Sequence, residues 1–189
     1  MSPIRSPDLR RLRKADRKVR LGALLAGLLV VALVGWLIFH DGGSSSSSGG
    51  PESATVEALR ESAAAQGTPI YWAGPQEGTE LEVTKTEGGG RTYVRYLTGG
   101  AQPGDPRAKF LTIGTYAFQD AAKALKRKGH EPGGILMSAP GSATVYINRE
   151  RPQSVYLAYP GGEVEIEVYD PDPRRALNLV TAGQIVPVG

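Results

Sequence analysis

The chain has 189 residues, of which 40% are hydrophobic and 22% are charged, values close to those of ordinary globular proteins. It contains no cysteine, which excludes disulfide bonds, thiolate metal sites, iron–sulfur clusters and cysteine nucleophiles. The net charge of +3 is unevenly distributed, because the first 20 residues hold eight basic and two acidic residues and the rest of the chain is net acidic. The positive charge therefore belongs to a tail, and we expect no binding of nucleic acid by the whole protein.

Residues 21–39, LGALLAGLLVVALVGWLIF, predict a transmembrane helix. These 19 residues carry no charge, and at 1.5 Å per residue they span about 28 Å, close to the hydrocarbon thickness of a bilayer. The arginine and lysine residues directly before the segment indicate a cytoplasmic N-terminus and an exported C-terminal part. The alternative is a cleaved signal peptide, whose apolar region is usually shorter and precedes small residues at a cleavage site. We expect an uncleaved anchor; cleavage within the Gly/Ser run that follows stays open.

Charge and composition divide the chain into four parts. We expect a basic cytoplasmic tail (1–20), the transmembrane helix (21–39), a flexible Gly/Ser linker (40–51) and an extracytoplasmic domain (52–189). The linker lacks the apolar residues needed to fold, so it tethers the domain close to the membrane. The tail is expected to orient the helix and to attract anionic membrane lipid, and recruitment of a cytoplasmic partner is the alternative.

The first half of the outer domain predicts a helix, a short β-prone run and a hairpin. The helix covers 53–67, because Ser53 or Thr55 can cap its N-terminus and Gly67 suits a left-handed C-terminus. The run TPIYWAG follows and ends at a Gly-Pro turn. Two alternating segments then flank the turn sequence EGGG and predict the hairpin strands 80–86 and 91–98.

The second half predicts a buried strand over 109–118, a helix over 119–129 and an antiparallel meander. Short, turn-like connections separate the meander strands, which are 135–139, 143–148, 154–159 and 163–169. A last helix is expected to begin after Asp172 and to end before Gly183. Strand runs between helices predict an α+β domain with a largely antiparallel sheet and about three helices.

Recognisable catalytic motifs are missing from the sequence. The two histidines, His40 and His130, do not have the spacing of a zinc site, and no nucleophile motif precedes His130. No phosphate-binding or dinucleotide-binding glycine pattern opens a helix. We therefore predict no catalytic residue, no metal site and no cofactor, and we do not expect an enzyme.

The last predicted strand carries three glutamates on one face. Glu163, Glu165 and Glu167 alternate with apolar residues, and Asp170 lies just beyond them. One interpretation is a cation site or the acid/base pair of a hydrolase. The favoured interpretation is a solvated sheet face, because the alternation is typical of a half-exposed strand.

The aromatic residues are the better indication of a binding site. Tyr71 and Trp72 lie beside a rigid Gly-Pro turn, and Tyr93 and Arg95 would share one face of a strand. Tyrosine, tryptophan and arginine are enriched where proteins bind one another, and the aromatic rings also suit stacking on sugars. We therefore predict binding by Tyr71, Trp72, Tyr93 and Arg95, with ordinary core packing as the alternative.

The layout resembles that of single-pass exported proteins of high-GC Gram-positive bacteria. The resemblance rests on the arginine-rich start, the Gly/Ala-rich span, the Gly/Ser linker, the cysteine-free outer domain and the phrases GTPIYWAGP and SVYLAYPG. It implies an envelope location and no functional residues. The leading hypothesis is a non-enzymatic, membrane-anchored domain that binds an envelope protein or a wall component. The alternatives are an anchored carboxylate hydrolase and an assembly or regulatory protein with a basic docking tail.

Overall fold

The computed structural model describes residues 49–86 and 90–189, which belong to one compact unit. The predicted tail, transmembrane helix and most of the linker lie outside these residues, so the membrane anchor stays a prediction. Within 49–86 and 90–189, no helix combines the length and the apolar character needed to cross a bilayer.

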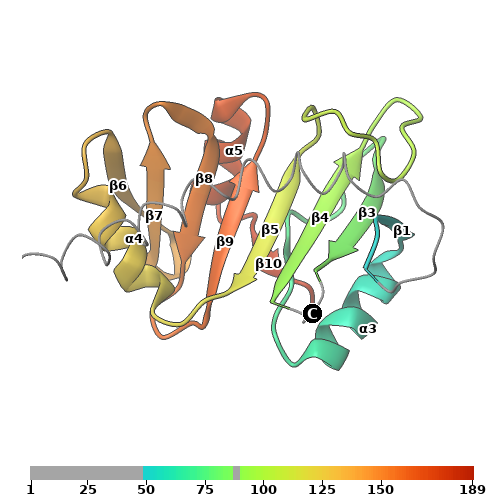
Figure 1. Ribbon diagram of the computed structural model, residues 1–189, viewed down its shortest axis with the longest axis horizontal. Coiled ribbons are helices and arrows are strands. Elements are labelled where there is room, and N and C mark those ends of the chain that lie inside the picture. Colours follow the sequence, from blue (N-terminus) through green and yellow to red (C-terminus); the bar gives the residue numbers. More distant parts are fainter. Residues whose placement is uncertain (1–48, 87–89) are drawn as a thin grey trace, which may run out of the picture. The chain divides into compact units, whose positions relative to one another are not determined.

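Eight antiparallel strands form the main sheet, in the order β1-β3-β4-β5-β9-β8-β7-β6 (Figure 1). Their bounds are β1 Glu52–Ala54, β3 Glu80–Lys85, β4 Arg91–Leu97, β5 Thr112–Ala117, β6 Gly134–Ala139, β7 Ala143–Asn148, β8 Arg151–Ala158 and β9 Val164–Tyr169. A small second sheet pairs β2 (Tyr71–Trp72) with β10 (Val186–Pro187). The helices of the described part are α3 (Val56–Gln66), α4 (Ala121–Gly129), α5 (Pro173–Thr181) and a short 3-10 turn, η1 (Pro140–Ser142). The predicted α+β class, with an antiparallel sheet and three α-helices, is confirmed for the described residues.

The helix ends follow the chemistry expected of their residues. The Thr55 side chain accepts a hydrogen bond from the Ala58 N–H at 3.1 Å, and Gly67 ends α3 with a φ of 63°. The Asp172 side chain accepts from the Arg174 N–H at 3.0 Å, and a proline occupies the first turn of α5. The predicted caps of both helices are confirmed.

The sheet joins two groups of strands at one central pair. Strands β6 to β9 form the predicted meander, and β3 to β5 form a second run of antiparallel neighbours. Strand β5 pairs with β9, so the connection through α4 carries the chain to β6 at the far edge of the sheet. Strands β1 and β10 were not predicted, because two or three residues are too few for an alternating pattern.

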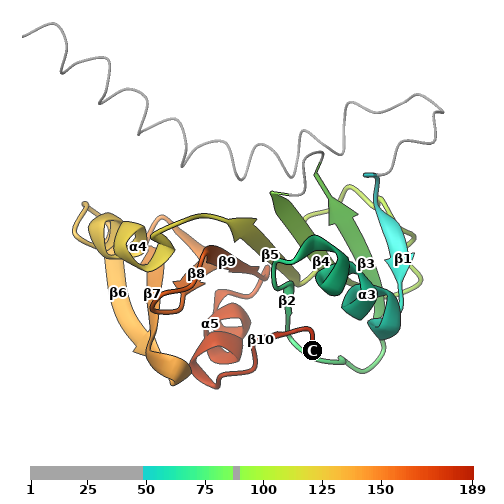
Figure 2. The ribbon, with the colours of Figure 1, turned by 90° about the horizontal axis from the view of Figure 1, so that it is seen from below.

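The two faces of the sheet are covered differently. Helices α3 and α5 and the small β2–β10 sheet pack on one face, where they share a single hydrophobic cluster with the strands. Helix α4 packs on the opposite face, with Ala121 and Leu125 against Tyr146 and Ala158 (Figure 2). We call these the apolar face and the polar face, since buried polar residues gather on the second.

Candidate functional site

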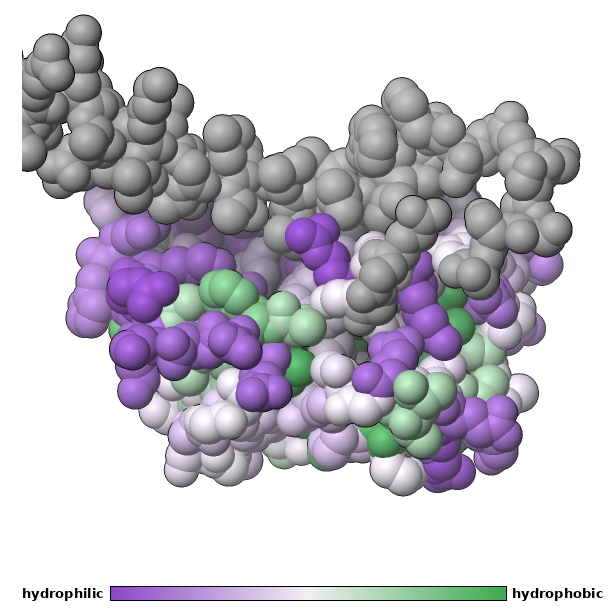
Figure 3. All heavy atoms as spheres, turned by 60° about the horizontal axis from the view of Figure 1, so that its bottom comes forward, coloured by the Kyte–Doolittle hydropathy of each residue, from purple (hydrophilic) through white to green (hydrophobic). Residues whose placement is uncertain are grey.

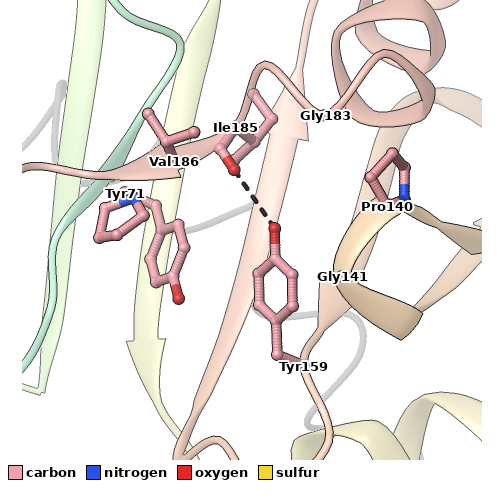
Figure 4. A pocket seen from close by; sticks show the side chains of 8 residues that line it. Tyr71, Pro140, Gly141, Tyr159, Gly183, Ile185 and Val186 are labelled. Carbon is pink, nitrogen blue, oxygen red and sulfur yellow. Dashed lines mark hydrogen bonds between the residues drawn. The ribbon is translucent and has the colours of Figure 1, made fainter.

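A pocket opens on the side of the apolar face, where the small sheet meets the turn between β6 and β7 (Figure 4). Its volume is about 330 Å³. The rings of Tyr71 and Tyr159 stack in it, with centroids 5.9 Å apart and planes at 17°. The Tyr159 hydroxyl donates a hydrogen bond to the Ile185 carbonyl at 3.3 Å. Pro140, Val186 and Pro187 complete most of the wall. The pocket thus brings together both sequence phrases that suggested a family resemblance.

Polar side chains of the main sheet hold Tyr71 in place. The Tyr71 N–H donates to Thr115 Oγ1 on β5 at 3.0 Å. The Tyr96 hydroxyl on β4 accepts from the Ala73 N–H at 2.8 Å and donates to the Gly74 carbonyl at 3.1 Å. A two-residue strand has few hydrogen bonds of its own, so these contacts fix the pocket wall to the sheet.

Two glycines leave the pocket open. A Cβ atom added to Gly141 would lie 3.0 Å from the Tyr159 ring, and one added to Gly183 would lie 3.2 Å from Pro140. Gly141 also has a φ of 73°, where a side chain is strained. Burial raises the pKa of both the Tyr71 and the Tyr159 phenol, so both stay neutral at physiological pH. None of the lining residues is charged, and the pocket suits an uncharged ligand.

The four predicted binding residues do not form one surface. Tyr71 lines the pocket, whereas Trp72 is buried in the hydrophobic cluster of the apolar face. Tyr93 and Arg95 share one face of β4, as predicted, but both are buried on the polar face. Arg95 donates to Glu82 Oε1 at 2.8 Å and to a loop carbonyl, and its guanidinium lies 5.0 Å from the centroid of a phenylalanine ring. These contacts occupy Arg95 within the fold.

A second candidate site lies on the polar face, and we call it the carboxylate–tyrosine cluster. Its members are Tyr93, Tyr116, Ser154, Tyr156, Glu165 and Glu167. Glu167 accepts hydrogen bonds from the Tyr116 hydroxyl at 2.5 Å, from the Ser154 hydroxyl at 2.7 Å and from the Tyr156 hydroxyl at 3.1 Å. Three donors thus surround one buried carboxylate, the arrangement that a buried charge needs.

Gly114 makes room for the centre of this cluster. It lies opposite Tyr93 on β4 and opposite Glu167 on β9. A Cβ atom added there would lie 2.6 Å from the Tyr116 hydroxyl and 2.9 Å from its ring. The Tyr116 ring therefore lies over the glycine and reaches Glu167, while its edge meets Tyr93 at a centroid distance of 5.8 Å. The glycine within a β-prone run was the available sequence signal for this close approach.

The prediction of a solvated glutamate face is wrong for two of its three members. Glu165 and Glu167 are only 9% and 6% exposed, whereas Glu163 is exposed. Packing of α4 on this face and the surrounding tyrosines account for the difference. Burial raises the pKa of the Glu165 carboxyl, and the Lys128 ammonium, 3.7 Å away, lowers it in part. Asp170 lies apart, in the turn before α5, where it accepts from the Asp172 N–H.

The hydrogen bonds of Glu167 all come from the protein itself. Both of its oxygens accept from hydroxyl groups on β5 and β8. Within the described residues, no group of three or more histidines, cysteines or carboxylates is placed to hold a metal ion.

Comparisons with protein-family models, with curated proteins and with solved structures give no match.

Proposed function

We propose that this protein is a single-pass, membrane-anchored component of the cell envelope, whose outer domain binds a partner without catalysis. The pocket lined by the stacked rings of Tyr71 and Tyr159 carries the proposal. The anchor, the cytoplasmic tail and the export of the domain rest on residues 1–39, which lie outside the described structure. A tether of about ten residues would keep the pocket near the membrane surface, where envelope proteins and wall components are found.

The lining of the pocket indicates the chemistry of its ligand. Two stacked neutral phenols, two prolines and no charged group favour an uncharged segment. Grooves lined by aromatic rings bind proline-rich peptides in the extended polyproline conformation, because such peptides lose little entropy on binding. One wall of the pocket is itself an extended segment, Val186–Pro187, which pairs with β2. We therefore propose an extended, uncharged peptide segment of an envelope protein as the ligand.

The other hypotheses have less support. A hydrolase would need two carboxylates facing a common open space, whereas Glu167 accepts three hydrogen bonds from the fold and Glu165 faces Lys128. The regulatory hypothesis depends on the basic tail, which lies outside the described residues. Neither has an observation in the fold that favours it over binding.

Site-specific crosslinking in cells tests the proposal with a matched control. Val186, 41% exposed, lines the pocket, and Phe118, 44% exposed, is the other large hydrophobic residue exposed in the described part and does not line it. Figure 3 shows one face of the domain, on which hydrophobic side chains lie in small separate areas, so nonspecific capture should be limited. A photo-reactive amino acid would replace Val186 or Phe118 in the full-length protein.

We expect a discrete crosslinked protein from position 186 and none from position 118. Tyr71→Ala, which removes one ring of the stack, should abolish the crosslink at 186, and Tyr71→Phe, which keeps the ring, should retain it. A crosslinked glycan instead of a protein would contradict the peptide ligand while supporting a binding domain. Equal labelling from both positions, or none from either, would contradict the pocket as the binding site.

A further inference from the structure

We propose that strand β6 is the docking site for a second copy of this chain, whose own β6 pairs with it antiparallel across a two-fold axis. The main sheet ends at β6 on one side and at β1 on the other (Figure 1). A strand at the end of a sheet has one side without a neighbour, where it can pair with a strand of another molecule. No residue of β6 lines the Tyr71–Tyr159 pocket, so the inference does not rest on the proposed function.

The two ends of the sheet differ in how well they are protected against such pairing. Strand β1 has three residues, follows Pro51 and carries Glu52. Short length, proline and charge are the features by which natural sheets prevent edge-to-edge pairing. Strand β6 has six residues, none of which is proline, charged or buried. The other strands of six or more residues in the main sheet all contain buried residues, so the edge at β6 is the open one.

Backbone hydrogen bonds show which groups of β6 point away from the sheet. The N–H of Arg149, the residue after β7, donates to the Gly133 carbonyl at 2.9 Å, so Gly133 bonds on the β7 side. In an antiparallel pair every second residue does the same, here Ile135 and the residues two and four further on. Leu136 and Ser138 therefore direct their N–H and C=O groups outward, and no other described segment forms a backbone hydrogen bond with them.

Two copies of β6 satisfy these outward groups for one another. With Met137 on the two-fold axis, Leu136 of each copy lies opposite Ser138 of the other. Each of the two pairs then exchanges N–H···O=C bonds in both directions, so every outward group of these residues is paired. The edge is thus self-complementary, as an interface between identical copies must be.

The side chains of β6 are also compatible with contact between two copies. Ile135 and Met137 pack, partly buried, against the hydrophobic cluster of the apolar face, and Leu136 packs beside α4 on the polar face. Pairing places Met137 against its counterpart on the axis, where cross-strand neighbours are closest. Because β6 carries no charge, no repulsion arises within the paired strands.

The nearest group of like charges lies far enough from the axis. The last turn of α4 is basic, with Lys126, Arg127 and Lys128, and it leads into the start of β6 at Gly134. The starts of two antiparallel strands lie on opposite sides of the axis, about 20 Å apart at about 3.3 Å per residue. The Debye length at physiological ionic strength is about 8 Å, so the two basic helix ends hardly repel each other.

The pairing stops at two copies and is favoured by the predicted membrane anchor. The protected edge at β1 does not match β6, so the contact closes as a dimer instead of growing into a filament. One pair of short strands is a small contact. Copies anchored in the same membrane would be held at a high effective concentration, which favours a contact of this size.

Disulfide crosslinking of single-cysteine variants tests the inference, because the natural chain has no cysteine. Met137→Cys would place two thiols beside each other on the axis, where opposed Cα atoms are about 4.5 Å apart, within the range that a disulfide spans. Ser138→Cys is the matched control, because its side chain is exposed but its counterpart is displaced along the strand. Both full-length variants would be oxidised in native membranes and separated on non-reducing gels.

We expect a covalent dimer from Met137→Cys, removed by a reducing agent, and none from Ser138→Cys. Both variants contain the same predicted anchor, so association of the anchors alone cannot produce this difference. Equal crosslinking from positions 137 and 138, or none from position 137, would overturn the inference. A disulfide from position 137 to a different protein, in place of the dimer, would also overturn it.

A second pair of variants tests the backbone contact. In the Met137→Cys background, Ser138→Pro removes an outward N–H that β7 does not use, and we expect the covalent dimer to be lost. Ser138→Ala keeps this N–H and should retain the dimer. A dimer that survives Ser138→Pro would contradict strand pairing. If Ser138→Pro fails to fold, as circular dichroism would show, the comparison of positions 137 and 138 still decides the matter.

Discussion

The apolar and polar faces of the sheet are both buried, but they are held together by different interactions. On the apolar face, Val94, Ile113 and Ile166 are fully buried in one continuous cluster, where contact is non-directional. On the polar face, Glu82 and Glu167 are nearly as buried, yet each needs specific donors at defined positions. The comparison teaches that two equally buried positions can differ in how well they tolerate substitution. A buried polar group that loses its hydrogen-bond partner keeps the free-energy cost of its desolvation.

The largest expected effect comes from breaking the Arg95–Glu82 pair. Arg95→Met leaves Glu82, which is 1% exposed, with the Gly104 N–H as its remaining partner, at 2.8 Å from Oε2. We expect a loss of about 3–5 kcal/mol in the free energy of unfolding, measured by urea denaturation. The double variant Glu82→Gln/Arg95→Met, which removes both charges, should recover most of that loss. Equal destabilisation of the single and double variants would show that stability depends on the packing of the Arg95 side chain and not on the unpaired charge of Glu82.

A smaller loss is expected from Gly114→Ala. The added methyl group would lie 2.6 Å from the Tyr116 hydroxyl, so the ring must move away from Glu167. We expect a destabilisation of about 1–3 kcal/mol, together with an altered absorbance of the buried tyrosines. Gly90→Ala adds a methyl group with nothing within 4 Å, at a position without a positive φ, and is the control for replacing a glycine by alanine. A loss no greater than that of Gly90→Ala would contradict the close packing at Gly114.

On the apolar face, a conservative change should cost less. Ile166→Val removes one methylene group from a fully buried position between α5 and the sheet. We expect a loss of about 0.5–1.5 kcal/mol in thermal or urea unfolding. If Ile166→Val lost more unfolding free energy than Gly114→Ala, the apolar face would tolerate substitution less well than the polar face.

The smallest effect concerns the dependence of stability on pH. Burial raises the pKa of Glu165 above its ordinary value of 4.5, so the folded protein binds this proton more tightly than the unfolded chain does. Stability contributed by the protonated form is therefore lost as pH rises from about 4.5 through the raised pKa. Glu165→Gln should remove this decline, whereas Glu163→Gln, an exposed neighbour, should leave it in place. Parallel pH profiles for the wild type and Glu165→Gln would show that the folded protein does not shift this pKa.

Local chemistry predicted much of the fold. The caps at Thr55 and Asp172, the left-handed Gly67 and the turn-separated meander all depend on residues close together in the chain. The alternation in β9 also predicted which residues face the core. Alternation cannot predict what covers the other face, and for that reason Glu165 and Glu167 were expected in solvent.

The sequence by itself determined the α+β class, the helix ends, the strand alternation and a prediction of a membrane anchor, because these depend on local periodicity and composition. Only the tertiary structure decided that Tyr71 stacks on Tyr159 and that Tyr93 faces Tyr116. The first contact joins two distant segments, β2 and the residue after β8, and the second depends on the pairing of β4 with β5. Such pairings are selected by the burial of the whole domain, a sum over many residues that no single stretch of the chain contains.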